Sequence, residues 1–226
     1  MVIDLRTQLK YYKKEMSELR QKKGHSEAPI ISSSAVYLFS IGTNDYISPF
    51  LLNSTTLMPS YHHSQYVEMA IHKRGGRKFV FLNLGELGCL PGLRILRAET
   101  KCGGCLEEAS YLAKLHNKAL KTLLSEMEQQ LHGFKYFLYD FNSSLAQKIT
   151  QPSKYGFKEG KKACCGTGHF NGIFSCGGKR VVKDYELCNN PSEFVFWDSY
   201  HLTERVYKQM ADQMWSRSLK KFFLCF

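Results

Sequence analysis

An aspartate and a histidine stand three residues apart near the end of the chain, directly after an apolar run. The run is Phe194-Val195-Phe196-Trp197, the pair is Asp198 and His201, and an amphipathic segment follows. At this spacing both side chains fit on one loop, where the carboxylate accepts the imidazole N–H and leaves the other ring nitrogen free to act as a base. A base of this kind needs a nucleophile elsewhere in the protein.

A second polar cluster, Gly42-Thr43-Asn44-Asp45, follows another apolar run. Polar side chains just past the carboxyl end of a parallel strand are where α/β sheets build their sites. Asn44 can offer its side-chain N–H₂ to a developing oxyanion. The alternative is an Asx turn that only ends the strand, and the local sequence alone favours that alternative.

Strands and helices alternate along the chain, which predicts an α/β fold with a parallel sheet. Residues 35–42 and 78–85 are continuous apolar runs, which is typical of strands buried on both faces. We expect a third strand at 134–141, loops at 25–29 and 47–60, and Ser143 and Thr203 as helix N-caps. The expected helices cover residues 5–24, 61–72, 112–131, 143–149 and the segment after Thr203.

Composition indicates one globular domain spanning residues 1–226 rather than a disordered chain. The 31 Lys and Arg against 20 Asp and Glu give a net charge of +11, which favours acidic surfaces such as glycans, anionic lipid or nucleic acid. Because no basic stripe is interleaved with aromatic residues, we prefer a solvated basic face and expect no nucleic-acid partner.

Eight cysteines in a chain of this size indicate disulfides and an oxidising compartment. Their pairing stays open at this point. Zinc is the rival interpretation, because Cys102-Gly-Gly-Cys105 has metal-ligand spacing. No second Cys-x-x-Cys pair follows, so disulfides rank above zinc. The long Gly- and Cys-rich segment from Ala163 to Cys188 is where we expect cross-linking.

The amino terminus, Met1-Val2-Ile3-Asp4-Leu5-Arg6, has no long apolar segment, so the sequence predicts no signal peptide here. No stretch is apolar for long enough to predict a transmembrane segment. Oxidised cysteines indicate a secreted protein, but no secretory signal is predicted. These two observations conflict. One resolution is that the start of the natural chain is missing.

Three features now line up: the Gly42–Asp45 cluster, the Asp198–His201 pair and the Cys-rich segment between them. Together they resemble the plant secreted branch of the GDSL esterase/lipase family, the SGNH hydrolases. The resemblance covers nearly the whole chain and extends to phrases without catalytic residues, among them Phe81-Leu82-Asn83-Leu84-Gly85, Gly88-Cys89-Leu90-Pro91, Ala163-Cys164-Cys165-Gly166-Thr167-Gly168 and Tyr185-Glu186-Leu187-Cys188.

The resemblance implies a flavodoxin-like three-layer α/β/α sandwich that hydrolyses carboxylic esters through an acyl-serine. It implies that His201 is the general base, that Asp198 orients it and that Asn44 is an oxyanion donor. It also implies an ester or lipid small-molecule substrate, no metal or organic cofactor, and an extracellular location. Oligomeric state stays unknown.

The chain departs from the family pattern at the nucleophile. The family's serine lies in an N-terminal Gly-Asp-Ser motif, and this tripeptide does not occur in the sequence. We therefore expect the N-terminal strand and the nucleophile to be missing. The alternative function is a catalytically inactive relative that binds lipid or a partner. Ser199 is rejected as a substitute because it lies two residues from His201 and lacks the strand-to-helix turn that presents a nucleophilic serine.

Overall fold

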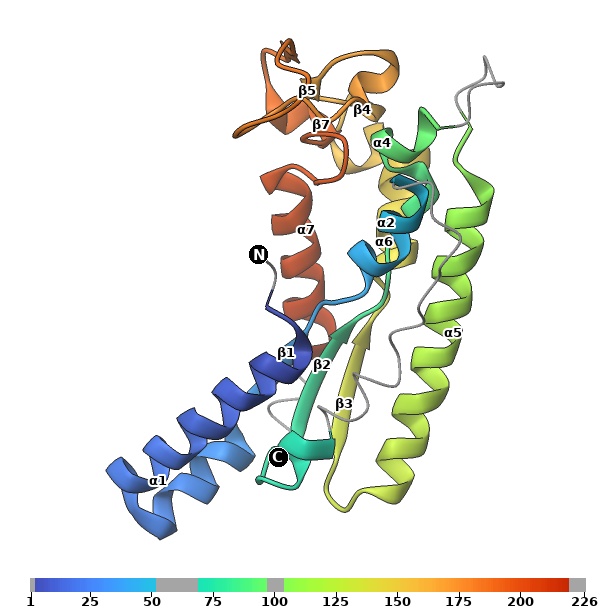
Figure 1. Ribbon diagram of the computed structural model, residues 1–226. Coiled ribbons are helices and arrows are strands. Elements are labelled where there is room, and N and C mark those ends of the chain that lie inside the picture. The colour runs from blue at the N-terminus through green and yellow to red at the C-terminus, as the bar shows by residue number, and fades with distance from the viewer. Residues whose placement is uncertain (1–2, 52–68, 97–103, 220–226) are drawn as a thin grey trace.

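The computed structural model describes residues 3–51, 69–96 and 104–219, which form an α/β fold with a parallel sheet (Figure 1). The strands are β1 (Val36–Phe39), β2 (Lys78–Leu82), β3 (Lys135–Tyr139), β4 (Glu159–Ala163), β5 (Cys165–Gly166), β6 (Glu186–Leu187) and β7 (Phe194–Phe196). The helices are α1 (Leu5–Ser34), α2 (Thr43–Leu51), α4 (Pro91–Arg94), α5 (Glu107–Gln130), α6 (Phe141–Thr150) and α7 (Glu204–Met214).

The main sheet has three parallel strands in the order β1-β2-β3. Its middle strand β2 is buried on both faces, with Phe79, Val80 and Phe81 almost inaccessible to solvent. Two short sheets lie beyond the carboxyl ends of these strands: β4 pairs with β7 in parallel, and β5 pairs with β6 antiparallel (Figure 1).

Helices cover the sheet in two groups that build two hydrophobic clusters. On one side, Leu124 and Met127 of α5 pack with Phe79 and Phe81 of β2. The second cluster lies nearer the carboxyl ends of the strands and joins side chains of α2, α6, β7 and α7. Figure 1 shows α5 and α7 on opposite sides of the sheet. The predicted α/β class with a parallel sheet between helices is therefore confirmed.

The predicted loop at residues 25–29 is wrong. The chain bends at Gly24, whose φ of 77° lies in the left-handed region that favours glycine, and then continues as the second arm of α1. Pro29 lies inside this arm. Glycine and proline are typical of loops, which is why a loop was predicted here. The two arms nevertheless form a helical hairpin, because Gly24 alone provides the bend.

Two further predictions also differ from the structure. The loop expected from residue 47 begins as helix, because α2 runs to Leu51. The N-cap of α6 is Asp140, whose carboxylate accepts the backbone N–H of Ser143, so Ser143 is not itself the cap. The prediction of Thr203 as the N-cap of α7 is confirmed, although its hydroxyl donates to the Phe194 carbonyl rather than accepting from the helix.

Strand β1 is not buried on both faces as predicted. Val36 and Leu38 are 40% and 61% exposed, while Tyr37 and Phe39 turn toward the core. The physical reason is position: β1 is the edge of the three-stranded sheet and has one neighbouring strand. Most of the helix predicted at 61–72 lies outside the described residues.

Three disulfides confirm the predicted cross-linking: Cys89–Cys105, Cys164–Cys188 and Cys165–Cys176. Cys102 lies outside the described residues, and Cys105 is already bonded to another cysteine, so the zinc interpretation of this pair is wrong. Over the described ranges, no group of three or more His, Cys, Asp or Glu side chains is arranged to hold a metal ion. None of the described helices is both long and apolar enough to cross a bilayer.

Candidate active site

The loop between β7 and α7 is clamped at both of its ends. The backbone N–H of Trp197 donates to the carbonyl of His201 at 2.9 Å, which closes residues 197–201 into a tight turn. The Thr203 hydroxyl then donates to the Phe194 carbonyl at 2.8 Å. Because Val195 and Phe196 are completely buried, the loop stands on a fixed base.

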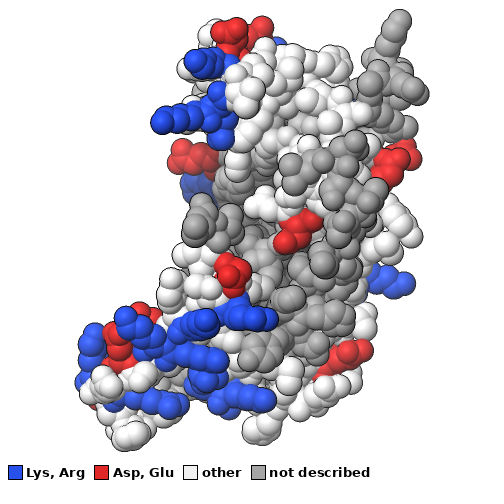
Figure 2. All heavy atoms as spheres, in the orientation of Figure 1, with Lys and Arg blue, Asp and Glu red and all other residues white. Residues whose placement is uncertain are grey.

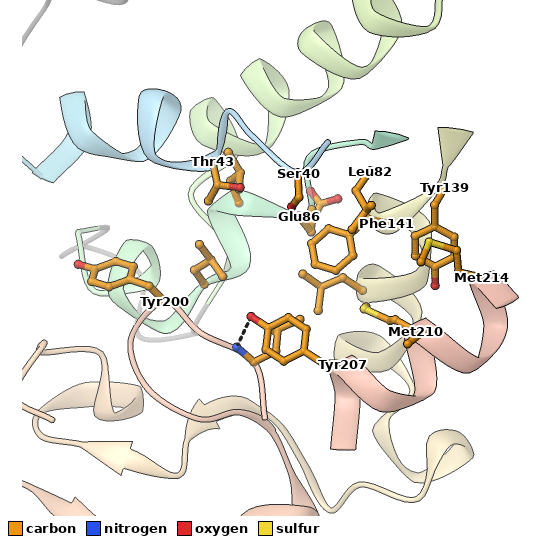
Figure 3. A pocket seen from close by; sticks show the side chains of 16 residues that line it. Ser40, Thr43, Leu82, Glu86, Tyr139, Phe141, Tyr200, Tyr207, Met210 and Met214 are labelled. Carbon is orange, nitrogen blue, oxygen red and sulfur yellow. Dashed lines mark hydrogen bonds between the residues drawn. The ribbon is translucent and has the colours of Figure 1, made fainter. Parts of the chain in front are cut away.

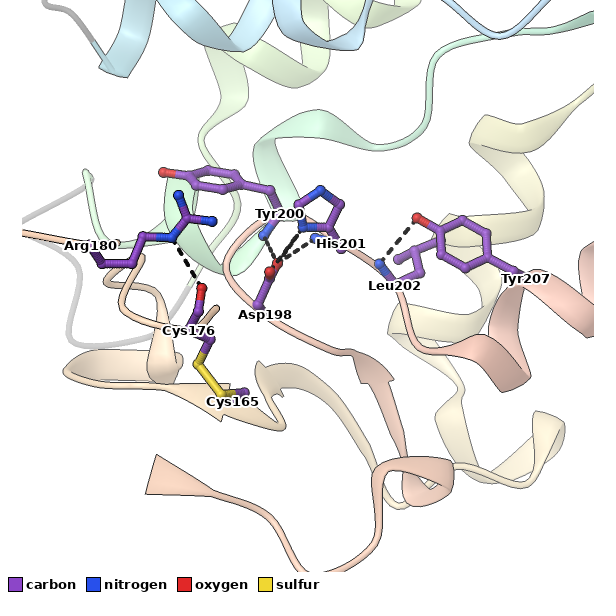
Figure 4. A network of polar contacts seen from close by, with 8 residues as sticks. All are labelled: Cys165, Cys176, Arg180, Asp198, Tyr200, His201, Leu202 and Tyr207. Atoms are coloured by element: carbon purple, nitrogen blue, oxygen red, sulfur yellow. Dashed lines mark hydrogen bonds and ion pairs between the residues drawn. A yellow bond between two sulfur atoms is a disulfide. The ribbon is translucent and has the colours of Figure 1, made fainter. Parts of the chain in front are cut away.

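Inside this turn the predicted pair is in contact (Figure 4). Nδ1 of His201 lies 2.8 Å from Oδ1 and 2.9 Å from Oδ2 of Asp198. The backbone N–H groups of Tyr200 and His201 also donate to Oδ1, at 2.9 and 2.8 Å. Since an ionised carboxylate only accepts hydrogen bonds, a neutral His201 carries its proton on Nδ1 and leaves Nε2 with a free lone pair.

The two members of the pair differ in solvent exposure. The Asp198 side chain is 8% exposed and the His201 side chain is 60% exposed, so the orienting acid lies inside and the imidazole is open to solvent. Burial, with a smaller contribution from the Asp198 charge, raises the pKa of Tyr200. It also raises the pKa of Tyr207, so both phenols stay protonated near neutral pH.

A cavity of about 250 Å³ lies beside this loop, between the carboxyl ends of the strands and α7 (Figure 3). Its walls are mostly apolar, with hydroxyl groups from several elements. The lining residues are Ser40, Thr43, Leu82, Gly85, Glu86, Leu87, Leu90, Tyr139, Phe141, Leu145, Tyr200, Leu202, Tyr207, Met210, Ala211 and Met214. Such a cavity suits the apolar part of a small ester.

The cavity connects the two polar clusters found in the sequence. Asn44 is exposed in the first turn of α2, so it belongs to a helix and not to a free Asx turn. Its neighbour Thr43 lines the cavity, as do Tyr200 and Leu202 on either side of His201. The structure thus brings the segment carrying Asn44 and the loop carrying His201 to the same cavity.

A buried polar contact with α5 holds the start of α2 in place. Nδ1 of His116 on α5 lies 3.2 Å from the Tyr46 hydroxyl. Burial lowers the pKa of His116 to about 4, so this imidazole is neutral at physiological pH. Gly42 has a φ of 108°, and a Cβ there would lie 3.1 Å from Leu84 and 3.5 Å from His116. Close packing therefore fixes the turn that enters α2.

Ser199 faces the interior of the protein. Its residue is 1% exposed, and its Oγ has no hydrogen-bond partner among the described residues. A hydroxyl in this position has no access to a substrate in solvent. The buried position of Ser199 agrees with the expectation that it is not the nucleophile.

Sequence reasoning missed the wall that α7 contributes to the cavity. Tyr207 lines the cavity, and its hydroxyl accepts the Leu202 N–H at 3.4 Å (Figure 4). A signal for it was present: residues 207, 210, 211 and 214 follow helical spacing, next to the stripe through Val206 that reaches the core. Tyr139, at the end of β3, carried no such signal.

Comparisons with known proteins agree with this geometry. A family model described as GDSL-like lipase/acylhydrolase matches residues 4–214. GDSL esterase/lipase 5 of Arabidopsis thaliana is 49% identical over 225 residues, which cover 95% of this chain and 57% of that protein. GDSL esterase/lipase 2 of the same plant is 43% identical over 227 residues, 96% of this chain and 60% of that protein.

A third relative bears on catalysis. Inactive GDSL esterase/lipase-like protein 25 of Arabidopsis thaliana is 38% identical over 194 residues, 81% of this chain and 44% of that protein. The chain therefore spans about three fifths of the length of the first two relatives and less of the third. With a family match along almost its entire length and the Asp198–His201 pair in hydrogen-bond contact, this chain belongs to the GDSL-like lipase/acylhydrolase family.

Proposed function

We propose that this chain carries the base and oxyanion part of a carboxylic ester hydrolase site. His201 is the general base, Asp198 orients it, and Asn44 donates to the oxyanion. One observation carries the proposal: the imidazole is held by both carboxylate oxygens, at 2.8 and 2.9 Å, while its outer edge stays open to solvent. A buried acid behind an exposed histidine is the arrangement that a serine-type hydrolase requires.

The proposed chemistry assigns each residue one step. Nε2 of His201 takes the proton of a hydroxyl nucleophile as that oxygen attacks the ester carbonyl carbon. The side-chain N–H₂ of Asn44 donates to the tetrahedral oxyanion. The protonated imidazole, stabilised by Asp198, then gives its proton to the departing alcohol. The substrate is a small ester whose apolar part enters the cavity beside Tyr200.

A second candidate function is ester or lipid binding without turnover. Two observations favour it: the family's Gly-Asp-Ser tripeptide does not occur in the 226 residues, and one relative carries the word inactive in its name. Serine hydrolases that lack one triad member keep only on the order of 10³-fold acceleration over water. Extracellular location is part of the proposal for either function, and the three disulfides support it.

The test is hydrolysis of a short-chain nitrophenyl ester by the purified chain. The variant is His201→Ala, and the matched control is His169→Ala, which removes another exposed loop histidine. Hydrolysis above background in the chain and the control, with its loss in His201→Ala, would mean that His201 activates a nucleophile within this chain. Equal rates in all three proteins would mean that the dyad has no nucleophile to activate, and binding without turnover would be the better assignment.

A further inference from the structure

Helix α1 is attached to the rest of the protein by only a small part of its surface. Of its 30 residues, three are buried: Leu9, Ala28 and Ser32. Residues 20–27, around the bend, are all exposed. Figure 1 shows the hairpin projecting from the lower end of the sheet, away from the β7–α7 loop. The hairpin therefore exposes most of its surface to solvent.

The base of the hairpin is fixed by a polar network. The Tyr12 and Tyr37 hydroxyls are 3.2 Å apart, and the Ser32 hydroxyl lies 3.1 Å from the Tyr37 hydroxyl. Ser32 also donates to the Arg74 carbonyl at 3.0 Å. The hairpin is therefore held at its base in a defined place, with the bend reaching outward.

Positive charge gathers on this hairpin. It carries seven Lys and Arg side chains against three Glu, and all seven cations are exposed: Arg6, Lys10, Lys13, Lys14, Arg20, Lys22 and Lys23. Two of them share Glu18 at 3.8 and 3.9 Å, which are weak surface pairs. Figure 2 shows the Lys and Arg side chains concentrated over the part of the molecule that α1 occupies.

Exposed aliphatic side chains lie close to these cations in the chain. Ile30 is 66% exposed and Ile31 38% exposed on the second arm of the hairpin. Two adjacent exposed isoleucines beside a cluster of cations combine apolar and positively charged surface on one structural unit. Tyr11, also exposed, lies one helical turn from Lys14.

We propose that the α1 hairpin docks on an anionic lipid bilayer. Its cations meet the headgroups, and the side chains of Ile30 and Ile31 enter the interface. Helices that combine exposed Lys and Arg with exposed apolar side chains bind at such surfaces, and clusters of four to eight cations favour anionic lipid. A nucleic acid or acidic polysaccharide would use the cations but leave the aliphatic groups in water. The proposal does not depend on ester hydrolysis.

Docking through α1 has a geometric consequence. The Asp198–His201 loop lies beyond the opposite, carboxyl ends of the strands (Figure 1). A chain docked by its hairpin therefore keeps the imidazole facing the aqueous side rather than the bilayer. Substrate would reach the cavity from solution.

The test is sedimentation of the full chain with vesicles. One set contains phosphatidylcholine alone, and the other contains phosphatidylcholine mixed with an equal amount of phosphatidylglycerol. We expect binding to the anionic vesicles only, weakened by added salt because headgroup attraction is screened. Binding to both sets alike, or to neither, would overturn the proposal.

Two sets of variants localise the binding. The first replaces Lys10, Lys13, Lys14 and Lys22 by Gln, which keeps helix propensity. The matched control replaces Lys118, Lys121, Lys154 and Lys208, four exposed lysines elsewhere, and so removes the same total charge. We expect vesicle binding to fall at least roughly tenfold in the first set and little in the control. Equal losses in both sets would mean that net charge alone is responsible, and the proposal would fail.

The aliphatic component is tested by Ile30→Gln with Ile31→Gln. We expect this variant to bind anionic vesicles more weakly while binding heparin as the unmodified chain does. If the variant leaves vesicle binding unchanged, the surface is a general polyanion site and the lipid assignment is wrong. If it instead abolishes self-association in analytical ultracentrifugation with vesicle binding intact, the aliphatic patch is a contact between two copies of the chain. Circular dichroism verifies that each variant is folded.

Discussion

Asp198 shows how one side chain can order a loop and orient a base together. One of its oxygens accepts the backbone N–H groups of Tyr200 and His201, and both oxygens contact Nδ1 of His201. The same carboxylate therefore fixes the backbone turn and the position of the ring. Because Asp198 and His201 are only three residues apart, local sequence was enough to predict the contact between their side chains.

His116 gives a residue-scale prediction about pH. Burial lowers its pKa in the folded protein to about 4, against 6.5 in an unfolded chain, so the unfolded state binds the extra proton between these values. The contribution of neutral His116 to the unfolding free energy is fully present above pH 6.5. As the pH falls to 4, the unfolding free energy drops by on the order of 3 kcal/mol. We expect His116→Gln to show a shallower fall of unfolding free energy over this range.

Urea unfolding at a series of pH values measures this difference. His169→Gln is the matched control, because it removes an exposed histidine. The control should follow the unmodified chain. Parallel curves for His116→Gln and the unmodified chain would show that His116 is not kept neutral by burial.

At the scale of elements, the Cys-rich segment packs against the loop that carries Asp198 and His201. The backbone N–H groups of Cys164 and Cys165 donate to the carbonyls of Phe196 and Trp197, at 2.9 and 2.7 Å. Both cysteines are disulfide-bonded, to Cys188 and Cys176. The cross-links thus anchor an extended segment of little regular structure and hold the strand against which the Asp198 loop is built.

Removing the Cys164–Cys188 disulfide should therefore lower the stability of the protein and increase the mobility of the Cys-rich segment. We expect Cys164→Ala with Cys188→Ala to lower the unfolding free energy by about 3 kcal/mol, because the bond closes a loop of 24 residues. Trypsin cleavage at Lys179 and Lys183 should become faster. Urea unfolding and timed proteolysis measure the two effects.

The control for that experiment is Cys89→Ala with Cys105→Ala. This pair closes a loop of 16 residues that ends just before α5 and contains neither tryptic site. It should lose stability without faster cleavage at Lys179 and Lys183. Unchanged cleavage in the Cys164 and Cys188 double variant would contradict the anchoring role of that bond.

The sequence predicted those elements whose residues carry a clear period and failed where position in the sheet decides the outcome. β2, β3, α5 and α7 followed from apolar runs and helical spacing. The exposure of Leu38 could not follow, because β1 reads like β2 and only the strand order makes it an edge. The cavity was also beyond sequence reasoning, since Tyr139 and Thr43 meet there only through tertiary packing.

On the scale of the whole molecule, the candidate site and the cationic hairpin lie at different ends. The cavity and the Asp198–His201 pair lie beyond the carboxyl ends of the parallel strands, and the cationic hairpin projects from the other end (Figures 1 and 2). The net charge of +11 is thus not spread evenly. A solvated basic face, which composition alone favoured, accounts for the charge but not for the exposed Ile30 and Ile31 beside it.

This division predicts a gradient of local stability along the molecule. Opening the outer part of α1 exposes little apolar surface, because residues 20–27 are already exposed, whereas opening β2 exposes Phe79, Val80 and Phe81. We expect amide hydrogens of α1 near the bend to exchange with solvent at least roughly a hundredfold faster than those of β2, since each 1.4 kcal/mol of opening free energy is a factor of ten. Hydrogen exchange followed by mass spectrometry resolves the two segments. Equal protection in α1 and β2 would mean that the hairpin opens only with the whole fold, and that its few buried contacts hold it more firmly than their area implies.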